Sequence, residues 1–265
     1  MSKIKFEPTN NNVGCYIFTN LKNFNKGEID EIKNLLNKFG VLFFKNQDLS
    51  PSEYINFSSN FGVPAKYPML KPHKDFENIY VIERKKTDTG KSFGEGPHTD
   101  SSYLENPPKF TFLQAIEVPE EGMGNTLFYN QFLAYESLPG DIKDKIENLK
   151  GIFSSQGKIA KTRLIREAEH GTSDIKEIKS EHNLVQKING RRTIYCSPGH
   201  IIGVTNLKSG QQELINFLSS HQTKKKFSFS FSWKKGDIAV WSNRSMLHAA
   251  TAFNGNRKMF RITIQ

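Results

Sequence analysis

A strict alternation of aromatic and serine residues near the end of the chain constrains the fold more than any other feature. Serines separate large aromatic side chains at every second position, namely Phe227, Phe229, Phe231 and Trp233. Successive side chains of a strand point to opposite faces, so this pattern predicts a half-buried β-strand. The chain must therefore build a sheet and cover one of its faces.

Periodicity predicts further elements along the chain. The segments predicted as strands are 41–44, 79–83, 109–118, 127–129, 184–188, 193–196, 238–241 and 259–264. The segments predicted as helices are 28–39, 51–62, 132–138, 141–149 and 209–220, the last with Ser209 and Gln212 as its capping pair. Strands are not regularly followed by crossover helices, which disfavours a doubly wound parallel sheet. We expect a mainly β fold with helical insertions, a β-sandwich or jelly roll.

The chain of 265 residues shows neither an internal repeat nor a linker. We therefore expect a single domain over residues 1–265. Residues 156–183 are polar, mixed in charge and weakly periodic, which predicts a long insertion that acts as a lid over a site.

Composition excludes several classes of protein. No apolar run approaches the roughly 18 residues that a membrane span requires. Two cysteines, Cys15 and Cys196, cannot form a disulfide framework. The first twelve residues carry lysines without an apolar segment, so no signal peptide is expected. We expect a soluble, cytoplasmic protein with no membrane contact.

The net charge of +10 raises the question of a nucleic-acid partner. The positive side chains are scattered in short clusters such as Lys224-Lys225-Lys226, and no long basic helix or tail gathers them. We expect no nucleic-acid partner, and a positive field would instead attract small anionic substrates. A non-enzymatic, basic β-sandwich that binds an acidic partner remains the alternative from a different class.

The segment His98-Thr99-Asp100 follows a glycine-rich loop. Residues two apart in an extended backbone point to the same face, so the imidazole and the carboxylate can reach one metal ion. Such a pair supplies two ligands of a 2-His-1-carboxylate triad, which holds Fe(II) with open positions. The third ligand must come from far along the chain, and His248 is the candidate.

Two arginines follow His248 in a segment that is otherwise apolar. Arg257 and Arg261 lie four positions apart on a predicted strand, so they face the same way. An inward-pointing guanidinium needs an anion, and its planar fork suits a carboxylate.

Three ordered blocks make the chain similar to the taurine/alpha-ketoglutarate dioxygenase family, from about Val41 to Ile264. The blocks are His98-Thr99-Asp100 with Ser102-Tyr103, then Gly122-Met123-Gly124-Asn125-Thr126, and then Gly236 to Arg244 with His248, Arg257 and Arg261. The resemblance implies a double-stranded β-helix, a jelly-roll or cupin-like fold. It also implies an oxidoreductase that uses Fe(II), 2-oxoglutarate and O2, with ascorbate as an activator in vitro.

The resemblance also implies roles for individual residues. His98, Asp100 and His248 would be the iron ligands and so the catalytic centre. Thr126 and Arg257 would hold 2-oxoglutarate, although the sequence leaves open whether Arg257 or Arg261 does so. The residues expected around the substrate are Tyr67, Glu95, Ser101, Tyr103 and Arg261, with Arg261 facing an anionic group and Glu95 an ammonium group.

The reaction implied is hydroxylation of a small anionic or zwitterionic molecule, with release of succinate and CO2. Tyr67 stands where taurine enzymes carry a sulfonate-binding histidine, which argues against taurine itself. A same-scaffold oxygenase acting on a carrier-bound or peptidic substrate is the second enzymatic alternative. Family members are often homo-oligomers, and no sequence feature decides that state here.

Overall fold

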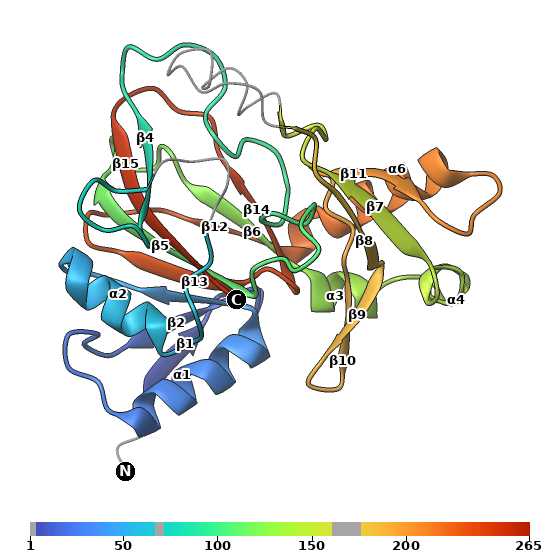
Figure 1. Ribbon diagram of the computed structural model, residues 1–265. Helices are drawn as coiled ribbons and strands as arrows, with labels where there is room; N and C mark the ends of the chain where they lie inside the picture. Colours follow the sequence, from blue (N-terminus) through green and yellow to red (C-terminus); the bar gives the residue numbers. More distant parts are fainter. Residues whose placement is uncertain (1–3, 67–71, 161–175) are drawn as a thin grey trace.

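Two sheets face each other in the computed structural model, which describes residues 4–66, 72–160 and 176–265 (Figure 1). The larger sheet has seven strands, in the order β1 (Lys5–Pro8), β2 (Cys15–Phe18), β3 (Val41–Phe44), β13 (Ile238–Ser242), β5 (Phe110–Glu117), β15 (Arg257–Ile264) and β4 (Tyr80–Arg84). The smaller sheet has three, in the order β12 (Ser228–Phe231), β6 (Thr126–Asn130) and β14 (Met246–Ala250). Apart from the parallel pair β2–β3, these strands pair antiparallel.

Aromatic side chains fill the space between the two sheets. Phe43 of the large sheet stacks on Phe231 of the small sheet with 4.4 Å between ring centroids, and Phe128 meets Phe43 edge-on at 5.5 Å. This core continues through Trp241 and Met259. The chain therefore forms the expected double-stranded β-helix, mainly β with helical insertions.

The serine–aromatic segment forms a shorter strand than predicted. Residues Lys225–Phe227 form a single 3-10 turn, so β12 begins at Ser228. Phe231 and Trp233 are buried as expected, although Trp233 lies beyond the end of the strand.

Two helices cover the outer face of the large sheet (Figure 1). Helix α1 (Lys26–Phe39) begins at an Asn25 capping box and ends at Gly40, whose φ of 79° favours glycine. Helix α2 (Pro51–Ser59) begins at the predicted Ser50–Glu53 capping box. Each helix buries its apolar face in the same cluster as Phe44 and Phe112.

The remaining elements form a lobe beside the small sheet (Figure 1). They are the helices α3 (Gln131–Glu136), α4 (Gly140–Ile146) and α6 (Gln211–Gln222), the sheet β11 (Ile201–Val204), β7 (Lys150–Ser154) and β8 (Lys179–Asn183), and the hairpin of β9 (Val185–Ile188) and β10 (Arg191–Ile194). The hairpin turns at Asn189 and Gly190, both at positive φ, as predicted.

Two details of this lobe differ from the sequence predictions. Gly210, in a left-handed conformation, is the N-cap of α6, so the predicted Ser209 cap is wrong. Residues 179–183 of the predicted insertion form strand β8 against β7. Residues 161–175 lie outside the described residues, so the lid stays a prediction.

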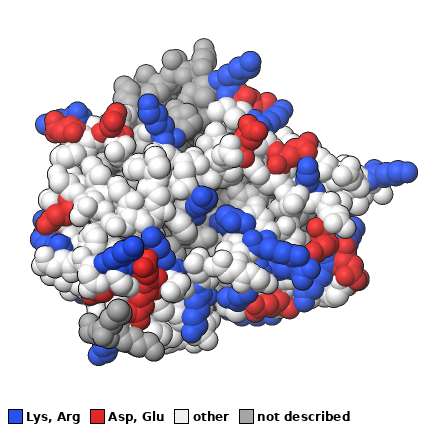
Figure 2. Space-filling view, turned by 60° about the horizontal axis from the view of Figure 1, so that its bottom comes forward, with Lys and Arg blue, Asp and Glu red and all other residues white. Residues whose placement is uncertain are grey.

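Basic side chains are interspersed with acidic ones over the face of the molecule shown in Figure 2. Arg191 lies 2.8 Å from Glu136, and Arg192 lies 3.0 Å from Glu147. Part of the positive charge is therefore paired with acidic side chains. Within the described part of the chain, every helix is too short or too polar to cross a membrane.

Candidate metal centre

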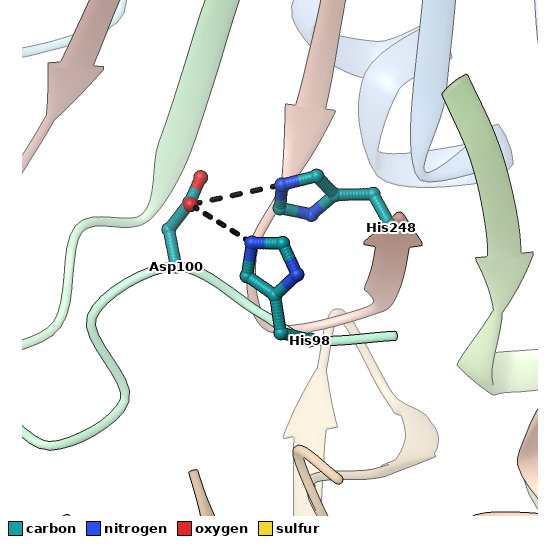
Figure 3. Close-up of side chains that lie close together, drawn as sticks. All are labelled: His98, Asp100 and His248. Atoms are coloured by element: carbon teal, nitrogen blue, oxygen red, sulfur yellow. Dashed lines mark ion pairs between the residues drawn. The ribbon is translucent and has the colours of Figure 1, made fainter. Parts of the chain in front are cut away.

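The structure brings together His98, Asp100 and His248, which are far apart in sequence (Figure 3). Nε2 of His98 lies 3.9 Å from Oδ1 of Asp100, and Nε2 of His248 lies 3.7 Å from the same oxygen. One ligand atom from each residue lies within 4.8 Å of the others, and all three residues are buried. A single metal ion between these atoms would have two imidazole nitrogens and one carboxylate oxygen as ligands.

Backbone hydrogen bonds set the spacing of the two histidines. His98 N donates to the His248 carbonyl at 2.9 Å, and His248 N donates to the His98 carbonyl at 2.8 Å. This antiparallel bridge pairs the middle of β14 with the segment that follows the glycine-rich loop. The ring centroids are consequently 4.2 Å apart.

The hydrogen bonds of His98 orient its ring for metal binding. Nδ1 of His98 lies 2.9 Å from the carbonyl of Gly96, so Nδ1 carries the proton and Nε2 presents its lone pair toward Asp100. Burial lowers the pKa of His98, and burial together with the neighbouring His98 lowers the pKa of His248 to about 3. Both imidazoles are therefore neutral at physiological pH, which is the form that binds metals.

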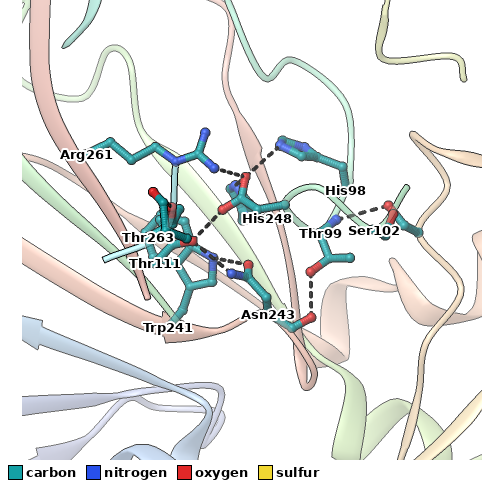
Figure 4. Close-up of polar contacts among 12 residues, drawn as sticks. His98, Thr99, Ser102, Thr111, Trp241, Asn243, His248, Arg261 and Thr263 are labelled. Atoms are coloured by element: carbon teal, nitrogen blue, oxygen red, sulfur yellow. Dashed lines mark hydrogen bonds and ion pairs between the residues drawn. The ribbon is translucent and has the colours of Figure 1, made fainter. Parts of the chain in front are cut away.

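A chain of hydrogen bonds fixes the Asp100 carboxylate (Figure 4). Oδ2 of Asp100 accepts from the Thr111 hydroxyl at 2.6 Å, and Thr111 accepts from the Asn243 amide at 2.9 Å. Asn243 in turn accepts from the Trp241 indole at 3.1 Å. Thr111 and Asn243 therefore belong to the site, although the sequence assigned a role to neither.

Arg261 is the charge partner of Asp100. Its Nη2 lies 3.0 Å from Oδ1, and both side chains are buried. Although burial raises the pKa of Asp100, Arg261 and the two histidines outweigh that effect and keep it well below its ordinary value. The carboxylate is therefore ionised and ready to bind a cation.

Thr126 and Arg257 line a cavity that the three candidate ligands also line. Thr126 Oγ1 accepts from the Trp233 indole at 3.0 Å. The Arg257 guanidinium lies 6.0 Å from the centroid of the Trp233 ring and 5.8 Å from that of the Phe253 ring. Among the described residues, Nε and Nη2 of Arg257 are buried without a hydrogen-bond partner.

The charge of Arg257 shows what kind of molecule the cavity can hold. Burial lowers the pKa of Arg257 to about 10, which still leaves it charged. A buried cation without a counter-ion is costly, so the cavity is suited to an anion. A dicarboxylate that reaches both Arg257 and the metal position matches the donors present.

A second cavity contacts the same centre and contains two of the expected substrate residues. Both cavities are lined by Phe93, Gly94, His98 and Asp100. The second is also lined by Ser101, Tyr103, Ser155, Ile159, Ala160 and His200. His200 was not predicted as a site residue, because a single histidine in a loop carries no signal of its own.

Of the other expected substrate residues, one lies outside the described part of the chain and one lines neither cavity. Tyr67 lies outside the described residues. Glu95 lines neither of the two cavities at the centre, and its carboxylate accepts a hydrogen bond from the backbone nitrogen of Ser92. Arg261 lines the first cavity but is absent from the described lining of the second.

Comparison with known proteins agrees with this geometry. The family model described as "Taurine catabolism dioxygenase TauD, TfdA family" matches residues 14–263. Pentalenolactone F synthase from Streptomyces avermitilis is 27% identical, with 86% of this chain and 81% of that protein covered. The alpha-ketoglutarate-dependent 2,4-dichlorophenoxyacetate dioxygenase of Cupriavidus pinatubonensis is 26% identical, with 89% and 88% covered.

A crystal structure of a taurine dioxygenase from Burkholderia xenovorans has the same fold. It superposes with a TM-score of 0.81 at 24% identity and covers 98% of this chain and 90% of that chain.

Proposed function

The chain belongs to the taurine catabolism dioxygenase TauD, TfdA family and is an oxidoreductase of the alpha-ketoglutarate-dependent dioxygenase class, and from this premise we propose its cofactors and reaction. It binds Fe(II) through His98, Asp100 and His248 and takes 2-oxoglutarate as co-substrate. It hydroxylates a small anionic or zwitterionic molecule and releases succinate and CO2.

One observation carries this proposal. A neutral His, an ionised Asp and a second neutral His line a cavity together with a buried arginine, two of whose nitrogens have no hydrogen-bond partner among the described residues. The first three residues are a ligand set suited to Fe(II) with open positions. The arginine would pair with the far carboxylate of a molecule that reaches the metal.

Each of these residues has a defined task in the proposed site. His98 offers Nε2 because Gly96 holds the proton on its Nδ1. Asp100 is kept ionised by Arg261 and oriented by Thr111. Arg257 pairs with the distal carboxylate of 2-oxoglutarate, and the Thr126 hydroxyl, whose oxygen already accepts from Trp233, donates its proton to the same carboxylate.

Iron and 2-oxoglutarate, when bound, supply the oxidising chemistry, in which 2-oxoglutarate becomes succinate and CO2 and one oxygen atom of O2 enters a C–H bond of the substrate. The protein contributes positioning and the exclusion of water. Buried apolar side chains such as Leu113 and Trp241 line the first cavity beside the ligands. The second cavity is the space in which a substrate can approach the same centre.

The names of the relatives agree with a small acid as substrate. One is named for 2,4-dichlorophenoxyacetate, and another is described as an alpha-ketoglutarate-dependent sulfate ester dioxygenase. The net charge of +10 would favour encounters with such anions.

Anaerobic spectroscopy tests the proposal without knowledge of the substrate. Fe(II) and 2-oxoglutarate added together should give a weak visible charge-transfer band, and neither should give it alone. His98→Ala should abolish the band. A wild-type protein that gives no band while retaining its fold would overturn the proposal.

A further inference from the structure

The residues that line the second cavity indicate which chemical groups a substrate can have there. It reaches the metal centre through His98 and Asp100, yet neither arginine of the first cavity is among its described lining residues. A substrate in this space must therefore find its polar contacts among other side chains.

Ser101 is the clearest of these contacts. It is 3% exposed, it lines the cavity, and its hydroxyl has no hydrogen-bond partner among the described residues. Its φ of 50° also places it in the left-handed region, which is unfavourable for a residue with a Cβ. The folded protein gains nothing from a buried, unsatisfied hydroxyl. A bound molecule is the partner that would account for it.

His200 is a second polar residue on the same wall. Its Nδ1 lies 2.9 Å from the Ser102 hydroxyl. With that hydroxyl donating to Nδ1, the neutral imidazole carries its proton on Nε2 and is a donor there. Tyr103 packs edge-on against this ring at 5.1 Å and also lines the cavity.

The rest of the described wall is apolar or shared with the metal centre. Phe93, Ile159 and Ala160 line it, and Asp100 is the one carboxylate among its described lining residues. Glu95, which the sequence suggested for an ammonium group, is hydrogen-bonded to the Ser92 backbone and lines neither of the two cavities at the centre. Among the described residues, this cavity thus offers polar groups to an anion, while its one carboxylate, Asp100, is a candidate metal ligand that is already paired with Arg261.

We propose, on the basis of the function proposed above, that the substrate is a monoanion with an apolar body and no ammonium group. Its anionic group lies against Ser101 and His200 instead of against Arg261. Its apolar part packs on Phe93, Ile159 and Ala160, next to the position of the metal.

Three probes of matched chain length test the charge preference: hexanoate, its ω-amino counterpart and hexanol. Each is titrated anaerobically into protein loaded with Fe(II) and 2-oxoglutarate, and the perturbation of the visible band is followed. Hexanoate should perturb the band and saturate. The other two should bind at least about tenfold more weakly, since each lacks the anion or carries an unmatched cation.

Two serine variants test the placement of the anion. Ser101→Ala should weaken hexanoate binding roughly tenfold, the expected loss of one hydrogen bond to a charged group. Ser92→Ala is the matched control, because Ser92 is also buried with an unpartnered hydroxyl among the described residues but lines neither of the two cavities at the centre. It should bind hexanoate as the wild type does, and neither variant should unfold at a lower temperature.

The outcomes separate this inference from the proposed function. Absence of the band before any probe is added would overturn the function itself. A normal band with equal binding of hexanoate and its ω-amino counterpart would overturn only the monoanion proposal. So would unchanged hexanoate binding in Ser101→Ala, or a normal band that none of the three probes perturbs.

Discussion

His98 and His248 are joined by two reciprocal backbone hydrogen bonds, of 2.9 and 2.8 Å, across 150 residues of sequence. The bridge uses main-chain atoms alone, so the spacing of the two rings does not depend on the rings themselves. The double-stranded β-helix therefore prepares the ligand pair before any metal binds.

Loss of one imidazole should consequently leave the fold intact while removing the metal. His98→Ala should keep the far-UV circular dichroism of the wild type. Its Fe(II) affinity should fall by more than the roughly hundredfold that loss of an outer partner of a ligand costs. Equilibrium dialysis measures the affinity. His182→Ala is the control, since His182 is a partly buried histidine hydrogen-bonded to Leu104, outside the ligand cluster. Wild-type metal affinity in His98→Ala would contradict the assignment.

Asp100 and Arg261 form a buried ion pair, so removing one charge should be costly even without metal. Asp100→Asn leaves the guanidinium uncompensated and should lower the free energy of unfolding by about 3 kcal/mol. Urea titration of the metal-free protein measures this change.

The double variant Asp100→Asn/Arg261→Met separates the two roles of Asp100. It should recover much of the stability, because neither member of this ion pair is then left as an unpaired buried charge, but it should not recover metal binding. A double variant as unstable as Asp100→Asn alone would show that the ion pair is not the source of the loss.

Arg257 should control the affinity for 2-oxoglutarate and leave metal binding unchanged. Arg257→Gln should raise the dissociation constant of 2-oxoglutarate by at least about thirtyfold, as expected for the loss of a buried charge partner. Anaerobic titration of the visible band gives the constant. Arg84→Gln is a matched control, because Arg84 lies 5.7 Å from the same Phe253 ring but donates to the carbonyls of Asp88 and Gly90. Equal affinity in Arg257→Gln and the wild type would reassign the co-substrate contact.

The metal-free protein should lose stability as the pH falls below about 6.5. Burial, with His98, holds the pKa of His248 at about 3 in the folded state, against 6.5 for an ordinary histidine. Between these values the unfolded chain binds a proton that the folded chain does not, so protonation favours unfolding. This imidazole alone contributes at most about 1.4 kcal/mol per pH unit.

Urea midpoints measured across this pH range test the effect. His248→Gln removes the titrating group, so its midpoint should fall less steeply with acid than that of the wild type. Parallel pH profiles for the two proteins would contradict the low pKa of His248.

Several helices and strands with a regular spacing of apolar residues were predicted correctly from the sequence. Ile29, Ile32 and Leu36 define one face of α1, and Gly40 ends it, so neighbouring residues carried all the information needed. The alternation in 257–264 likewise placed Arg257 and Arg261 on one face, and both line the first cavity.

Several strands that lack a clear pattern of their own and depend on distant partners were not predicted. Strand β14 reads Met-Leu-His-Ala-Ala, which has no clear period of two, and it is a strand because it pairs with β6. Strands β7 and β11 contain Gly151 and Gly203 and also depend on each other for pairing. The three candidate metal ligands could be predicted because they lie in sequence blocks that resemble those of a known family. The contacts of Thr111 and His200, by contrast, exist only in the folded chain.

The most direct test of the account is succinate formation from 2-oxoglutarate in air, with Fe(II) and ascorbate, in the wild type and in His248→Ala. The wild type should form succinate slowly without added substrate and faster with a monoanion that fits the second cavity. His248→Ala should form none above the protein-free rate. Equal succinate from both proteins, or none from the wild type together with no visible band under anaerobic conditions, would contradict an iron- and 2-oxoglutarate-dependent oxygenase.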